Sequence, residues 1–170
     1  MRLFRFRSLQ YQLITSMILL LAIFSISLSL IYFPETQETL WKGKKDKVEN
    51  LVQSQMGVLQ HYYSLYKQGE MSESRAKSKA KDAIENAKYG EQNRQYFYIF
   101  DMQPKMIMHP DGNRMDGESI SGLQDPHGKY LIKQMLQVVK NKGAGFVNYH
   151  WQYYDNEQRV EPKVAYVQKF

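Results

Sequence analysis

The stretch that decides the fold runs from residue 95 to residue 112 and reads QYFYIFDMQPKMIMHPDG. Aromatic and β-branched residues fill Gln95–Asp101, as in a strand. Gln103–Lys105 contains a proline and turns the chain, and Met106–His109 returns it. The pattern predicts a β-hairpin that ends at the His-Pro-Asp-Gly sequence of residues 109–112.

One helix and two further strands are expected after this hairpin. A polar loop with several glycines covers residues 117–128. Residues 130–141 then carry apolar side chains at helical spacing and predict a short amphipathic helix. Residues 146–151 and 163–169 are strand-like, and the polar residues 153–159 between them predict a turn.

Two helices are expected before the hairpin. Apolar residues recur every three or four positions within Glu35–Lys67, which predicts a long helix. The pattern breaks at Gln68–Glu70, and Ser72 is placed to cap a second helix. The apolar stripe of the long helix suits two partners, the domain's own sheet or the same helix of a second chain, and both can hold along different lengths. The second helix has a face of small apolar residues: Ala76, Ala80, Ala83, Ile84 and Ala87.

An uncharged apolar run extends from Leu13 to Phe33. As a helix it would be about 31 Å long, which matches the hydrocarbon core of a bilayer. Its Ser and Thr hydroxyls can bond back to helix carbonyls. A cleaved signal peptide is the alternative, but the run is longer than a signal core and no A-x-A-like site follows it. We therefore expect a cytoplasmic N-terminus over residues 1–10, a transmembrane helix over 11–33 and an extracytoplasmic domain over 34–170.

The orientation follows from the charges beside this helix. Arg2, Arg5 and Arg7 precede it without an acidic residue between them. Short basic flanks are retained in the cytoplasm, so the domain after Pro34 is expected to face outward.

Composition and motifs argue against several classes of function. The net charge is +6, but Lys and Arg are interspersed with Asp and Glu and accompany no nucleic-acid motif, so no nucleic-acid partner is expected. The chain has no Cys, which excludes disulfides, thiolate metal sites and Cys nucleophiles. No G-x-S-x-G elbow is present. We therefore expect no enzyme activity and no cofactor. No metal site is expected either, because one set of acidic and histidine residues matches no known metal-ligand spacing: His109, Asp111, Asp116, Asp125 and His127.

Four segments, in this order, resemble the single Cache sensor domain of the second type: YFYIFDMQPKMIMHPDG at 96–112, DGESISGLQDPHGKYL at 116–131, GAGFVNYHWQ at 143–152 and EPKVAYVQKF at 161–170. Such domains lie outside the membrane in bacterial chemoreceptors, sensor kinases and cyclic-dinucleotide enzymes. The resemblance runs from Glu35 to Phe170. It implies an α+β fold in which a long and a shorter helix pack on a curved antiparallel sheet.

The chain departs from this family at three places. Gln95 stands where the family usually has Gly, and Lys88 precedes Tyr89 where the family often has Arg. The family's last strand is absent, so we expect a C-terminally truncated sensor whose output module lies in a further part of the protein. The resemblance also implies a bacterial inner membrane, a periplasmic or extracellular sensor, and a homodimer formed through the long N-terminal helix.

The resemblance implies a small carboxylate ligand, which would need convergent donors in an aromatic site. The same residues also have purely structural explanations. Alternating aromatic residues on a sheet more often belong to the core than to a ligand site. His109 can simply end its strand, and Lys163 can be a solvent-exposed charge on an edge strand. We expect the ligand-sensing region of a transmembrane chemoreceptor. The alternatives are the same sensor on a histidine kinase or diguanylate cyclase, or a membrane-tethered module without a small ligand. The candidate ligand-binding residues are Tyr96, Tyr98, His109, Tyr149, Trp151, Lys163 and Tyr166.

Overall fold

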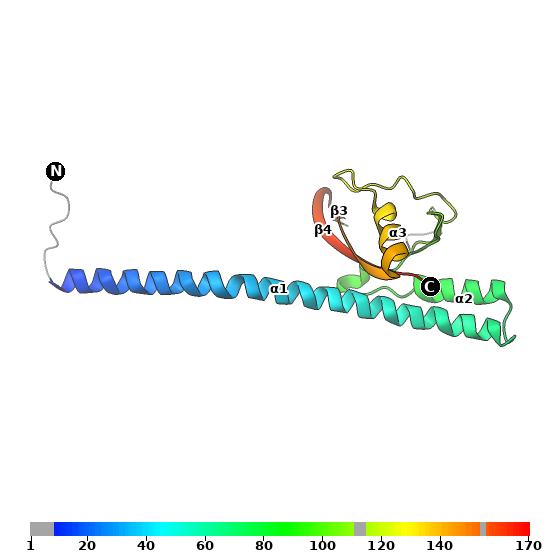
Figure 1. Ribbon diagram of the computed structural model, residues 1–170, viewed down its shortest axis with the longest axis horizontal. Coiled ribbons are helices and arrows are strands. Elements are labelled where there is room, and N and C mark those ends of the chain that lie inside the picture. Colours follow the sequence, from blue (N-terminus) through cyan, green and yellow to red (C-terminus); the bar gives the residue numbers. More distant parts are fainter. Residues whose placement is uncertain (1–8, 111–114, 154–155) are drawn as a thin grey trace. The chain divides into compact units, whose positions relative to one another are not determined.

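The structure is a computed structural model that describes residues 9–110, 115–153 and 156–170. The chain divides into two compact units, Met1–Lys44 and Lys45–Phe170. The fold is α+β, as expected (Figure 1). Its elements are, in chain order, α1 (Leu9–Lys67), α2 (Glu73–Glu85), a 3₁₀ turn η1 (Glu91–Asn93), β1 (Ile99–Phe100), β2 (Met106–Met108), α3 (Leu131–Lys142), β3 (Ala144–Tyr153) and β4 (Asn156–Gln168).

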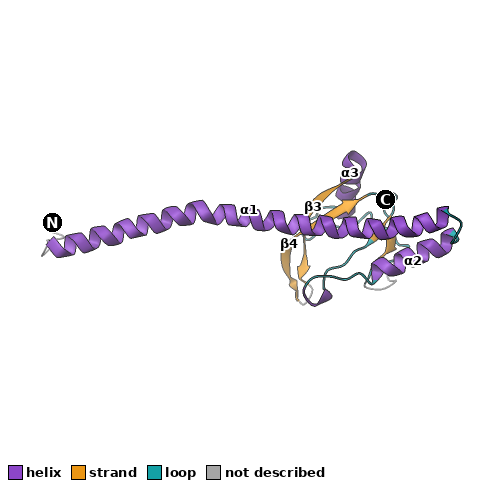
Figure 2. Ribbon diagram, turned by 90° about the horizontal axis from the view of Figure 1, so that it is seen from below, coloured by secondary structure: helices purple, strands orange, loops and turns teal. Residues whose placement is uncertain are grey.

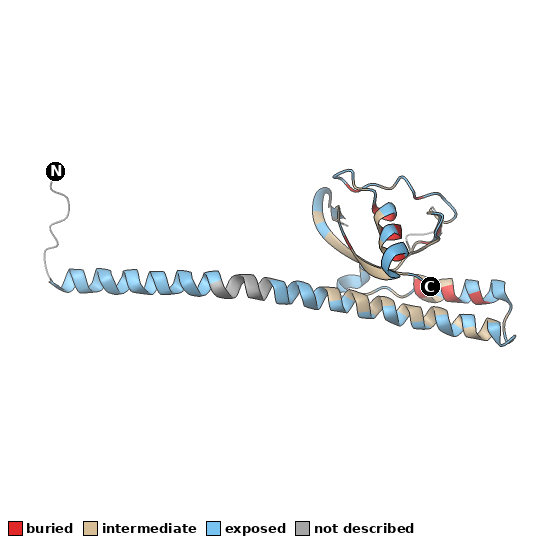
Figure 3. Cartoon of the chain, in the orientation of Figure 1, coloured by how far each residue is buried: buried red, intermediate tan, exposed pale blue. Residues whose placement is uncertain are grey.

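The first unit contains the apolar part of α1. Leu9–Leu30 has a mean hydropathy of 2.4 and is long and apolar enough to cross a membrane. The polar side chains within it bond to the helix itself: the Thr15 hydroxyl donates to the Tyr11 carbonyl and the Ser27 hydroxyl to the Ile23 carbonyl, both at 2.8 Å. The expected back-bonding is thus confirmed, and every side chain described in this stretch is exposed (Figure 3).

In the second unit, α2 runs beside the C-terminal end of α1 (Figures 1 and 2). α1 ends at Lys67, and Gly69 then takes a positive φ of 78°, a conformation that glycine adopts without strain. The Ser72 hydroxyl caps α2 by accepting a hydrogen bond from the Arg75 N–H at 3.4 Å. The predicted break and cap are confirmed. On the predicted small-residue face, Ala76, Ala80 and Ile84 are buried.

The predicted β-hairpin is present but shorter than expected. β1 pairs antiparallel with β2, with Ile99 opposite Met108. The prediction of a strand from Gln95 is wrong for residues 95–98, where an isolated bridge between Tyr89 and Gln95 takes the place of a ladder. The aromatic residues there pack through their rings, which β-propensity alone does not distinguish from strand pairing.

β3 and β4 form a second antiparallel sheet that is longer than expected. The register runs from Ala144 opposite Gln168 to Tyr153 opposite Asn156. The predicted turn over residues 153–159 is therefore wrong, because β4 already begins at Asn156. Polar residues can continue a strand where cross-strand hydrogen bonds, rather than burial, hold it.

The core lies where α3 packs on β3 and β4. α3 confirms the predicted helix and ends at Gly143, which has a φ of 77°. The buried side chains of α3 form one cluster with those of β2, β3 and the intervening loop. Figure 3 shows the buried residues of α3 in red. This core comprises Met106, Ile120, Ile132, Met135, Leu136 and Val147.

The opposite face of the β3–β4 sheet meets α1. The Tyr166 hydroxyl donates to Glu49 Oε1 at 3.1 Å, and Lys45 Nζ lies 5.6 Å from the centroid of the Phe146 ring. The apolar stripe of α1 is half-buried, including Leu51 and Leu59. These contacts of Glu49 and Lys45 show that α1 lies against the domain's own sheet, which is one of the two partners expected for its apolar stripe.

Candidate functional site

Aromatic rings gather where β1 and β2 approach the core. The ring of His109 lies 5.0 Å from that of Tyr96 and 6.2 Å from that of Tyr98, between centroids. Tyr98 in turn stacks on Phe100 at 6.1 Å. Tyr96, Tyr98 and Phe100 are alternate residues, so an extended backbone presents all three on one side. The His-Pro sequence ends β2 and leaves His109 beside them.

Strand β3 presents Tyr149 and Trp151 on one face, with ring centroids 6.4 Å apart. The register places Lys163 directly across from Tyr149, and Glu161 across from Trp151. Cross-strand partners point to the same face of a sheet. An amine and a carboxylate therefore lie beside these two rings, on the face that also carries the core residue Val147.

Burial controls the ionisation of the tyrosines in this cluster. Burial raises the pKa of Tyr149 to about 12, with smaller contributions from the neighbouring phenols of Tyr96 and Tyr89. Burial also raises the pKa of Tyr98, again with smaller effects from Tyr149 and Tyr96. The Tyr98 hydroxyl donates to Sδ of the buried Met135 at 3.3 Å. These phenols remain neutral hydrogen-bonding groups at neutral pH.

The same cluster contains a half-buried amine. Burial lowers the pKa of Lys163, and the nearby Glu161 carboxylate partly restores it. Glu161 is itself paired with Arg159, whose Nη2 lies 2.5 Å from Glu161 Oε1. Among the residues that the structure describes, Glu161 is the acidic neighbour that offsets the burial of the Lys163 amine, and the pKa of Lys163 is still lowered. A bound anion would complete the compensation.

Two carboxylates outside the cluster hold its supporting loop. Asp116 accepts the His109 N–H through Oδ1 at 3.1 Å and Lys81 Nζ through Oδ2 at 2.7 Å. Asp125, only 5% exposed, accepts three backbone N–H groups, from His127, Lys129 and His150, at 2.9, 2.9 and 3.1 Å. Burial alone would raise the pKa of Asp125, but these donors outweigh it and the pKa is lowered.

Comparison with known proteins identifies the family. The Cache domain family matches residues 28–170 of this chain. The chain belongs to the Cache domain family.

Two chemotaxis proteins and a sensor histidine kinase are similar to this chain. Methyl-accepting chemotaxis protein McpP of Pseudomonas putida is 31% identical over 145 residues, which are 85% of this chain and 26% of that protein. Methyl-accepting chemotaxis protein CtpM of Pseudomonas aeruginosa is 27% identical over 78% of this chain and 22% of its own length. Sensor histidine kinase MctS of Rhizobium johnstonii is 24% identical over 68% of this chain and 24% of its own length. The chain spans about a quarter of the length of these relatives.

Two solved sensory domains share the fold. One is a Cache chemosensory domain described for its recognition of carboxylic acids: it is 36% identical, has a TM-score of 0.70, and the match covers 78% of this chain and 88% of that one. A periplasmic sensor domain of a chemotaxis protein is 30% identical with a TM-score of 0.69, over 76% of this chain and 88% of that one. The chain is therefore a Cache sensor domain, of the kind found in chemotaxis receptors and a sensor histidine kinase.

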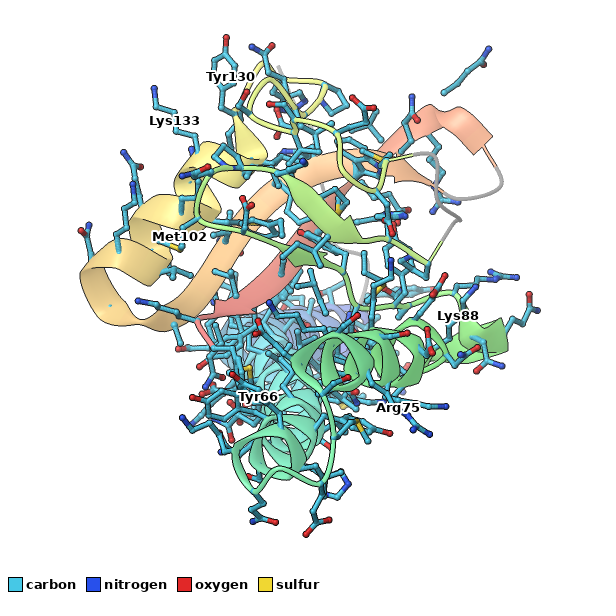
Figure 4. The ribbon with its side chains drawn as sticks, turned by 90° about the vertical axis from the view of Figure 1, so that its right-hand side faces the viewer. Tyr66, Arg75, Lys88, Met102, Tyr130 and Lys133 are labelled. Atoms are coloured by element: carbon cyan, nitrogen blue, oxygen red, sulfur yellow. The ribbon has the colours of Figure 1, made fainter. Side chains whose placement is uncertain are left out.

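Not all predicted site residues of this Cache domain come together. Tyr166 lies on the opposite face of the β3–β4 sheet, bonded to Glu49 of α1. Tyr130 and Lys133 were not among the predicted site residues, and they point outward at the start of α3 (Figure 4). The structure places the other six on the inner face of the sheet or in the ring cluster beside β1 and β2: Tyr96, Tyr98, His109, Tyr149, Trp151 and Lys163.

Three neighbours of the cluster were not among the candidate ligand-binding residues: Tyr89, Lys81 and Asp116. The phenol of Tyr89 interacts with that of Tyr149, and its ring lies 5.1 Å from that of Phe97. A tyrosine just before the aromatic segment was a usable signal for Tyr89. The contact between Lys81 and Asp116 joins residues 35 positions apart, and no local pattern predicts it.

Proposed function

We propose that this Cache domain binds a small organic anion, a short carboxylate, at the aromatic cluster, as the sensor of a transmembrane chemoreceptor. The observation that carries the proposal is the half-buried Lys163 amine set directly across from Tyr149. This pair offers a positive charge and a neutral phenol donor to the same ligand atom group. Recognition of carboxylic acids by a similar Cache domain, 36% identical, supports it.

The chemistry of the cluster suits a carboxylate. An anion is bound well by a few convergent donors in surroundings that exclude water. Lys163 supplies the charge, and the phenols of Tyr149 and Tyr96 supply directional hydrogen bonds. Trp151 and Phe100 supply apolar walls, and His109 adds a second nitrogen donor from the other side. Tyr166 is left out of the proposed site because it lies on the α1 side of the sheet.

The proposal places the apolar part of α1 in a bacterial inner membrane. Leu9–Leu30 would span it, and the three arginines before this helix favour a cytoplasmic N-terminus with the sensor outside. The similarity to two chemotaxis proteins supports a chemoreceptor output beyond this domain. A histidine kinase output is the second candidate, supported by the weaker similarity to MctS.

We also infer that two chains associate through α1. In one chain the apolar stripe of α1 is half-buried rather than fully buried, so part of it is available to a second copy. Sedimentation of the full chain in detergent micelles should give the mass of a dimer. A strictly monomeric protein at all concentrations would contradict this inference.

A thermal-shift screen tests the ligand. The full chain in detergent micelles is melted with acetate, propionate, pyruvate, lactate and larger diacids. A ligand that binds only the folded state stabilises it by about 2.7 kcal/mol at a hundred times its Kd. We expect a selective rise in Tm with short carboxylates that disappears in Lys163→Met and His109→Ala but persists in Lys169→Met, an exposed lysine near the same strand. No rise with any acid would contradict the proposal.

A further inference from the structure

Asp116 connects the aromatic cluster to helix α2. Its carboxylate uses both oxygens: Oδ1 accepts the backbone N–H of His109 at 3.1 Å, and Oδ2 accepts Lys81 Nζ at 2.7 Å. The side chains of Lys81 and Asp116 are 34% and 17% exposed. One rigid, planar group therefore joins a residue of α2 to the backbone of a residue in the cluster.

This contact differs from the other ion pair that the structure describes on α2. Lys77 and Glu73 are paired at 2.6 Å one turn earlier, but their side chains are 76% and 56% exposed and both belong to the same helix. Solvent-exposed ion pairs within one helix contribute little to the stability of the fold. The bond to Asp116 is partly shielded from water, joins two separate segments, and raises the pKa of Lys81. The two pairs thus provide a matched comparison on one helix.

Lys81 lies next to the packed face of α2, so its bond to Asp116 connects the cluster to the helices. Lys81 follows Ala80, which is buried together with Ala76 and Ile84 on the packed face of α2. α2 runs beside the C-terminal end of α1 in the same compact unit (Figures 1 and 2). The Asp116 carboxylate is thus the connection through which a displacement of the His109 backbone would reach α2, and a displacement of α2 would reach His109.

We propose that Asp116 is a positioning residue that holds His109 in the cluster and couples the occupancy of the cluster to α2 through Lys81. The effect on ligand affinity rests on the proposed function, whereas the positioning of His109 by Asp116 does not. Thermodynamic linkage is reciprocal. If ligand binding beside His109 changes the stability of α2 through the Lys81–Asp116 bond, then breaking that bond must change the affinity for the ligand.

The test compares Lys81→Met with Lys77→Met in the full chain. Backbone amide NMR without ligand should show a shift of the His109 resonance in Lys81→Met and none in Lys77→Met. Asp116→Asn, which keeps an oxygen for the His109 N–H but loses the charge, should resemble Lys81→Met. With a short carboxylate that stabilises the wild type, Lys81→Met should weaken binding about fivefold, which corresponds to about 1 kcal/mol, and Lys77→Met should leave it unchanged.

A second readout separates positioning from general stability. Hydrogen exchange of the α2 amides should slow when ligand binds the wild type, and this slowing should be lost in Lys81→Met. In a double-mutant cycle the affinity losses of Lys81→Met and Asp116→Asn should not add, because both remove the same bond. An unmoved His109 amide in Lys81→Met, or equal effects of the two lysine variants, would overturn the coupling. If no acid binds the wild type, the proposed function is contradicted. The shift of the His109 amide resonance without ligand still tests whether Lys81 and Asp116 position His109.

Discussion

At the scale of single residues, Lys163 shows a conflict between stability and binding. Its amine is half-buried, and burial lowers its pKa from the ordinary value of 10.5. Below the lowered pKa the amine is charged in both the folded and the unfolded chain, so the folded state bears the full cost of the buried charge. As pH rises from the lowered value to the ordinary one, the folded chain loses its proton first and stability increases.

We therefore expect Lys163→Met to raise the Tm of the ligand-free chain at neutral pH while abolishing stabilisation by carboxylates. Glu161 would not be left unpaired, because Arg159 already binds it at 2.5 Å. Thermal melts from pH 7 to 10 should show the gain shrinking as the wild-type amine loses its proton. The control is Lys169→Met, which should change neither quantity. A lower Tm for ligand-free Lys163→Met would contradict the assigned burial cost.

Asp125 has the opposite pH dependence. Its pKa is lowered, so the stability that its carboxylate contributes is complete above its ordinary pKa of 3.8 and is lost as pH falls through the lowered value. We expect Asp125→Asn to lower the urea midpoint at pH 7, because the amide nitrogen cannot accept an N–H that one of the carboxylate oxygens now accepts. The two midpoints should converge in acid. Parallel midpoints from pH 7 to 3 would argue against this role.

Residue-level prediction succeeded where strand alternation decides. Tyr149 and Trp151 are two positions apart and share a face, as their spacing predicts. Lys163 and Tyr166 are three positions apart on β4, so the same rule places them on opposite faces of the sheet, as the structure does. Asp116 was beyond reach because its partners come from a helix and a backbone N–H that only tertiary structure brings together.

At the scale of elements, the contact between α3 and β3 depends on a glycine. A Cβ at Gly145 would lie 2.8 Å from Cγ1 of Val138 on α3. The β-branched side chain of Val138 has few alternative rotamers, so α3 would have to move. We expect Gly145→Ala to cost about 1–3 kcal/mol of unfolding free energy, measured by urea denaturation.

Two variants make this prediction specific. Gly122→Ala, where a Cβ meets nothing within 4 Å, should be close to neutral. Val138→Ala should relieve the clash, so the cost of Gly145→Ala should be about 1 kcal/mol smaller in that background. Equal costs in both backgrounds would show that the glycine matters for another reason.

Helices were predictable from sequence and strand ends were not. The break at residues 68–70, the Ser72 cap and the stop at Gly143 are local signals, and each lies where it was expected. The bounds of β1 and β4 depend on which residues find a pairing partner across the sheet. That information is not contained in a window of sequence around either strand.

At the scale of the whole molecule, the chain combines an apolar helical unit with a sensor unit. The same helix, α1, contributes to both: it is exposed and apolar over Leu9–Leu30 and half-buried over its apolar stripe after Lys45. The apolar pattern changes from a continuous run to one apolar residue every three or four positions, as a helix that passes from lipid into protein surroundings would require. The sequence predicts this change of pattern, and the burial of α1 after Lys45 agrees with it.

The orientation of the chain in the membrane can be measured directly. The chain has no Cys, so single cysteines report without background. We expect Lys142→Cys, an exposed position at the end of α3, to react with a membrane-impermeant maleimide on intact spheroplasts. Ser8→Cys, beside the arginines, should react only after the membrane is opened. Replacing Arg2, Arg5 and Arg7 with Ser should reduce this asymmetry, because the basic flank is what retains the N-terminus inside. Labelling of Ser8→Cys in intact spheroplasts would place the sensor in the cytoplasm, where it could not sample external acids.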